Sequence, residues 1–102
     1  MPPPVTPLVP VDRERFLRQN EVKIRSMASN ALASGSKRDP LLVNAFNALL
    51  YCEDFHDRHS IAVTANRAAN RNTTAEEHER FSQKAIQLKL RTLDQLCHLV
   101  GF

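Results

Sequence analysis

A long stretch from Leu41 to Asn70 contains neither glycine nor proline, and it constrains the fold more than any other feature of the chain. Asp39 and Pro40 come directly before it, and this pair is typical of a helix start because the aspartate can accept a backbone hydrogen bond and proline is tolerated in the first turn. Apolar residues recur along the stretch at three- and four-residue spacing. The pattern predicts one helix over about residues 40–70, roughly 45 Å long.

A similar periodicity predicts a helix on the N-terminal side of this stretch. Apolar residues recur from Phe16 to Ala31, which indicates a helix over about residues 12–34. Asp12 is the expected N-cap, and Gly35 is the expected stop.

A third helix is expected over about residues 74–100. Thr73 and Thr74 each precede a glutamate by three residues, so either threonine can form a capping box, and Gly101 is the expected end. The apolar positions of this helix cover about half of its circumference, more than one neighbour requires. The sequence therefore predicts an all-α fold: an elongated antiparallel bundle of three helices, which we expect to form a homodimer. No strand pattern is present.

Five of the six prolines lie in residues 2–10, so we expect residues 1–10 to form a disordered proline-rich tail and residues 11–102 to form a single helical domain. The tail lacks the basic start of a signal peptide, and no apolar run is long enough to span a membrane. The two cysteines are then expected to be free thiols in a reducing compartment, which favours a cytoplasmic location.

The net charge of +3 is unevenly distributed. Residues 1–38 carry seven basic and three acidic side chains, a balance of +4, and the rest of the chain has a balance of −1. Two interpretations remain open for this basic third: a solvated surface of mixed charge, or a basic edge that contacts phosphate.

The segment "YCEDFHDRHS" at residues 51–60 concentrates residue types that bind metals or transfer protons. Its single Glu-x-x-His is only half of a di-iron motif. The register of two antiparallel helices joined near residues 70–73 places His59 and His78 roughly 9 Å apart along the axis, too far for a shared metal. The expectation is therefore no metal, no cofactor and no enzymatic activity. His56 and His59 are expected to line a helix interface as neutral, hydrogen-bonded side chains.

Two function classes remain: a helical module that binds other proteins, as an adaptor or inhibitor, and a rigid helical surface that binds a nucleic-acid duplex by shape. Asparagine and arginine on the polar side of the 40–70 helix suit contacts to phosphate and ribose, which do not read sequence. Asp54 and Asp57 interrupt the positive potential there.

The segments "RDPLLVNAF" and "YCEDFHDRH" resemble the small RNA-silencing suppressors of insect nodaviruses. The resemblance covers roughly residues 38–70 and implies a helical homodimer that binds double-stranded RNA without sequence preference. It implies a viral protein of the host cytoplasm that protects viral RNA from silencing, and it leaves open a host silencing protein as an additional partner.

The family's helix cysteine and basic residues carry over to particular positions of this chain. Cys52 and Arg58 look like the matching RNA-facing positions, and Arg67 and Arg71 are looser matches. Lys37 and Arg38 lie near the start of the same helix. By periodicity alone, however, Cys52 belongs to the apolar side of the helix.

Overall fold

The computed structural model describes residues 8–34 and 39–102, which fold into three helices. Helix α1 spans Val11–Ala33, α2 spans Pro40–Ala68 and α3 spans Asn72–Leu99. No β-strand occurs within the described residues, so the expected all-α class is confirmed. Each helix begins and ends within two residues of its predicted bounds.

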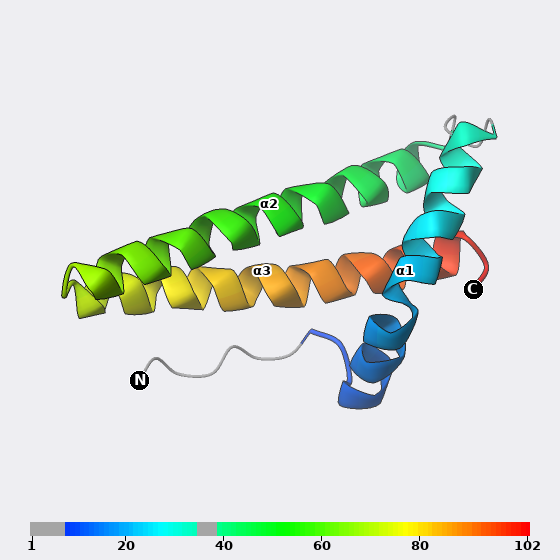
Figure 1. The fold of residues 1–102 in the computed structure, drawn as a ribbon. Helices are drawn as coiled ribbons and strands as arrows, with labels where there is room; N and C mark the ends of the chain where they lie inside the picture. The colour runs from blue at the N-terminus through cyan, green and yellow to red at the C-terminus, as the bar shows by residue number, and fades with distance from the viewer. Residues whose placement is uncertain (1–7, 35–38) are drawn as a thin grey trace.

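Helices α2 and α3 lie side by side and run in opposite directions, joined by a short turn (Figure 1). Helix α1 crosses this pair at the end far from the turn, beside the start of α2 and the end of α3 (Figure 1). It packs mainly on α3. The wide apolar side of α3 therefore contacts two neighbouring helices, as its pattern predicts.

The apolar core lies at the end of the α2–α3 pair that α1 covers. There, leucines from all three helices are almost fully buried, and each stabilises the fold by about 1.5–3 kcal/mol. Toward the turn, the buried positions are small or polar, and they include Asn66, Ala75 and Ser82. The structure thus has an apolar three-helix end and a more polar two-helix end. The core residues are Val9, Leu17, Ile24, Ala28, Leu42, Ala45, Leu49, Leu90, Leu93, Leu96 and Cys97.

Three ion pairs tie α1 to the other helices around this core. Arg13 Nε lies 2.6 Å from Asp94 Oδ1, and Lys89 Nζ lies 3.1 Å from Glu21 Oε1. Arg25 pairs with Glu53 of α2. The hydrogen bond to Asp94 raises the pKa of the Arg13 guanidinium above its usual value.

The start of α2 and the end of α3 follow the predicted capping chemistry. The Asp39 side chain accepts a hydrogen bond from the Leu41 N–H, and Pro40 occupies the first helical position. At the end of α3, Gly101 has a φ of 75°, which glycine adopts without steric cost. The N–H of Gly101 bonds to the carbonyl of His98, and that of Phe102 to the carbonyl of Cys97, which is a Schellman motif.

The α2–α3 turn uses the same motif with asparagine in place of glycine. Asn70 has a φ of 60°, and the N–H of Arg71 bonds to the carbonyl of Asn66 at 2.8 Å. The expected capping box at Thr73 or Thr74 is wrong, because α3 already begins at Asn72 and its N-cap, Arg71, makes no side-chain capping bond. The tight turn at Asn70 starts the helix before either threonine can occupy the capping position.

The start of α1 also differs from the prediction. Its N-cap is Pro10, so Asp12 lies inside the first turn, where its charge still favours the positive end of the helix dipole. Residues 8–10 do not extend away as the expected tail would. Val9 is buried in the core, and the Leu8 N–H donates to Gln87 Oε1 at 3.3 Å. Residues 1–7 and the expected stop at Gly35 lie outside the described residues.

Candidate nucleic-acid interface

Cys52 is half-buried between α2 and α3 rather than fully presented to solvent. Burial raises the pKa of its thiol, and a hydrogen bond with the Thr92 side chain partly opposes that rise. This location agrees with the periodicity, which assigns Cys52 to the apolar side of α2. Two other predicted contacts, Lys37 and Arg38, lie outside the described residues.

Two of the predicted arginines are engaged in intramolecular ion pairs. Arg58 lies one turn from Asp54, with 3.0 Å between Nε and Oδ2, and its side chain is 78% exposed. Arg67 donates to Glu79 of α3 at 2.7 Å. Exposed pairs of this kind are worth about 0–1 kcal/mol, so either carboxylate can be exchanged for a phosphate.

Arg71 has a structural role in the turn as well as a charge. Its Nε donates to Asn66 Oδ1 at 2.8 Å, and Asn66 Nδ2 donates to the carbonyl of Ala62. Arg71 itself is exposed. It places a positive charge at the turn end of the α2–α3 pair.

A row of basic residues on α3 was not identified from the sequence. Arg80, Lys84 and Arg91, here called the α3 stripe, are all exposed. Their spacing of four and seven residues puts them on one side of the helix, opposite the buried Leu93 and Leu96. None of the three has an ion-pair partner within residues 8–34 and 39–102. The sequence does contain a signal for this row, because the three basic residues stand at i, i+4 and i+11, which is helical spacing.

The basic residues of α1 contrast with the α3 stripe. Arg13 and Arg25 pair with acids on the other helices, and Arg18 pairs with Glu14 one turn away. Lys23 lies over the Phe102 ring, 4.9 Å from its centroid. Arg15, the fifth basic residue of α1, is exposed and has no ion-pair partner among residues 8–34 and 39–102. Because the other four each have a partner, α1 fits the mixed-charge interpretation better than that of an open basic edge.

The histidines of "YCEDFHDRHS" lie on the α2–α3 interface. His59 Nδ1 is 2.8 Å from His78 Nδ1, so the expected separation of these residues is wrong. The register estimate located backbone positions along the axis and ignored the reach of the imidazole rings. Burial, followed by the neighbouring His78, lowers the pKa of His59. His56 is half-buried, with Nε2 3.5 Å from Ser60 Oγ.

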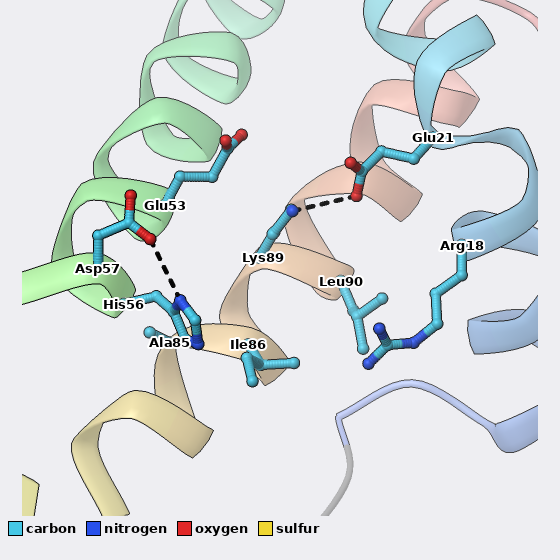
Figure 2. A pocket seen from close by; sticks show the side chains of 9 residues that line it. All are labelled: Arg18, Glu21, Glu53, His56, Asp57, Ala85, Ile86, Lys89 and Leu90. Carbon is cyan, nitrogen blue, oxygen red and sulfur yellow. Dashed lines mark ion pairs between the residues drawn. The ribbon is translucent and has the colours of Figure 1, made fainter. Parts of the chain in front are cut away.

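A cavity of about 260 Å³ opens where the three helices meet, and Figure 2 shows its charged side chains. Each of its carboxylates lies near a cationic or titratable group: Glu21 pairs with Lys89, Glu53 pairs with Arg25, and Asp57 lies 3.5 Å from His56. The cavity is smaller than most pockets for organic ligands. Its charged side chains already have partners, either within the lining or, for Arg18 and Glu53, just outside it.

Residues 8–34 and 39–102 also lack two further kinds of feature. They contain no group of three or more His, Cys, Asp or Glu side chains arranged to hold a metal ion. None of the three helices is long and apolar enough to cross a bilayer.

Comparison of the chain with protein-family models, with curated proteins and with solved structures gives no match. The function is therefore inferred from the arrangement of these side chains.

Proposed function

We propose that this protein binds double-stranded RNA through phosphate and ribose contacts, without reading sequence. The observation that carries the proposal is the α3 stripe, because its three exposed cations have no carboxylate partner in the described part of the chain. Contacts from lysine and arginine to phosphate supply affinity that does not depend on sequence.

The geometry of α3 suits a duplex better than a compact anion. A regular helix holds Arg80 and Arg91 about 16 Å apart, with Lys84 between them on the same side. A row of this length can contact several phosphates of one backbone. Arg67 and Arg71 add charge at the turn end, and Arg58 adds charge on α2, once their present partners are exchanged for phosphate.

The active form in this proposal is a homodimer that builds an elongated antiparallel bundle. Tyr51 and Phe81 are 69% and 44% exposed, and Leu88 is exposed on the same helix as Phe81. Burying such side chains against a second copy would remove apolar surface from water. The dimer would carry a charge of +6, twice the +3 of one chain, and it would strengthen the attraction to RNA.

The biological role that fits such a protein is suppression of RNA silencing by a virus in the host cytoplasm. A protein that covers duplex RNA regardless of sequence would block the nucleases that cut it. The partial resemblance of residues 38–70 to nodavirus suppressors supports this role. A host silencing protein is a further partner that the proposal allows.

The test compares the wild-type chain with the triple variant R80Q/K84Q/R91Q by fluorescence anisotropy on generic duplex RNA at several salt concentrations. The variant should bind at least about tenfold more weakly, and its plot of log affinity against log salt should be flatter by about 2–3 units. The control R15Q/R18Q/K23Q removes the same charge from α1. Equal losses in the two variants would show that total charge, and not the α3 stripe, governs binding.

A second candidate, a helical module that binds other proteins, is supported by the exposed apolar side chains. Besides Tyr51 and Phe81, Leu50 and Ile61 of α2 are largely exposed. Exposed apolar residues that cluster are typical of protein interfaces. If the wild-type chain leaves duplex RNA unbound even in low salt, this second function replaces the first.

A further inference from the structure

We propose that His59 and His78 form a two-histidine chelate for a divalent transition-metal ion, at a site separate from the RNA surface. The ring nitrogens that face one another belong to different helices, His59 to α2 and His78 to α3. A bound ion would therefore link the two helices directly.

The distance between the two nitrogens suits a shared ion. His59 Nδ1 and His78 Nδ1 are 2.8 Å apart, and the ring centroids are 5.0 Å apart with 34° between the planes. Two nitrogens that occupy adjacent positions of a square-planar or octahedral shell, each about 2.0–2.1 Å from the metal, lie about 2.9 Å apart. To bind one ion, each ring must turn so that its Nδ1 lone pair points at the ion and not at the other nitrogen.

In the metal-free protein the two Nδ1 atoms are joined by a hydrogen bond. One ring must donate its Nδ1–H to the Nδ1 lone pair of the other, because two unprotonated nitrogens at this distance would repel. A neutral donor ring carries its only proton on Nδ1, so that proton must move to Nε2, by exchange with water, before both Nδ1 lone pairs can face the cation. Each ring then holds one proton, on Nε2, and no net proton is released.

Neighbouring aromatic side chains hold the His59 ring in place. Its centroid is 4.3 Å from that of Phe55 and 5.2 Å from that of Phe81. Ligands that are already positioned lose little conformational freedom on binding, which increases affinity. The same rings leave few positions for further protein ligands, so water would fill the rest of the shell.

The ligand set determines which ions should bind. Imidazole suits copper, nickel and zinc, and the order of affinities for such a site places Cu²⁺ above Ni²⁺ and Zn²⁺. The described residues offer no third His, Cys, Asp or Glu in a metal-binding group, so the bound ion should exchange readily. A structural zinc site, with four protein ligands, would hold its ion far more tightly.

The test is isothermal titration calorimetry of the 102-residue chain with CuCl₂ and NiCl₂ in a buffer that does not bind metals. The wild type should bind one Cu²⁺ with two nitrogen ligands, as seen in the electron paramagnetic resonance spectrum. H59F, which keeps an aromatic ring in the cluster, and H78N should each weaken that binding at least tenfold. H98N changes an exposed histidine at the end of α3 and should leave the affinity unchanged.

Thermal unfolding gives a second readout. Excess Ni²⁺ should raise the melting temperature of the wild type and of H98N but not that of H59F or H78N. Copper binding that H59F and H78N retain at wild-type affinity would overturn the proposal, and so would a nickel shift that survives in both. RNA binding is measured separately in the presence of EDTA, so the two proposals fail independently.

Discussion

Arg67 of α2 donates to Glu79 of α3 across the helical hairpin, with 2.7 Å between Nη2 and Oε2. The two side chains are 55% and 35% exposed, so the pair adds little to stability. Its importance for the proposed function is different: the carboxylate of Glu79 occupies the guanidinium that phosphate would otherwise contact.

Replacing Glu79 by glutamine should therefore strengthen duplex RNA binding by about three- to tenfold in low salt, because it leaves Arg67 available to phosphate. Anisotropy titrations measure the effect. E76Q removes the same charge from an exposed position of α3 that has no ion pair in the described residues, and it should change affinity by less than about twofold. Equal effects of E79Q and E76Q would contradict a role for Arg67.

The left-handed backbone at Asn70 predicts opposite outcomes for two substitutions. N70A should lower the free energy of unfolding by about 1–2 kcal/mol, since alanine pays a steric cost at a φ of 60°. N70G should retain or slightly increase stability, because glycine is the preferred residue of this motif. Urea unfolding followed by circular dichroism distinguishes them. Similar losses for both would mean that the asparagine side chain, and not the backbone, matters there.

The location of the core predicts unequal costs for two leucines of α2. Leu49 is fully buried, so L49A should lower the free energy of unfolding by about 2–5 kcal/mol through lost burial and the cavity left behind. Leu41 is 61% exposed, and L41A should cost less than about 1 kcal/mol. Denaturant midpoints of the two variants test this. A large cost at Leu41 would indicate that a second copy covers it.

The raised pKa of Cys52 predicts slow modification that speeds up as pH rises. Because the thiolate is the reactive form, iodoacetamide at pH 8 should label Cys52 several-fold more slowly than glutathione. T92V removes the hydrogen bond that lowers this pKa, so labelling should become slower still. Peptide mass spectrometry separates Cys52 from the buried Cys97. Faster labelling in T92V would show that access, and not thiolate formation, limits the rate.

Much of the fold could be predicted because its signals are local. The Asp39–Pro40 start and the Gly101 stop are decided by residues adjacent in the chain, and both predictions are confirmed. The false capping box at Thr73 and Thr74 was also a local signal, but the conformation of Asn70 overrode it. Local patterns therefore located the helices better than they located the caps.

The candidate site depended on contacts between helices, which a single sequence does not specify. No pattern of adjacent residues predicts that Glu79 pairs with Arg67 or that the rings of His59 and His78 are in contact. The pairing of Arg58 with Asp54, four residues apart, could have been read from helical spacing. The α3 stripe could also have been predicted, because its residues lie at helical spacing in the sequence.

The separation of an apolar three-helix end from a polar two-helix end has a consequence for local unfolding. Amides near the α2–α3 turn are protected by helical hydrogen bonds with few leucines behind them, whereas those around Leu49 and Leu93 can open only when the core is disrupted. In native-state hydrogen exchange the turn end should behave as a separate cooperative unit of lower opening free energy. The turn end of the α2–α3 pair would then unfold locally while the three-helix end stays folded.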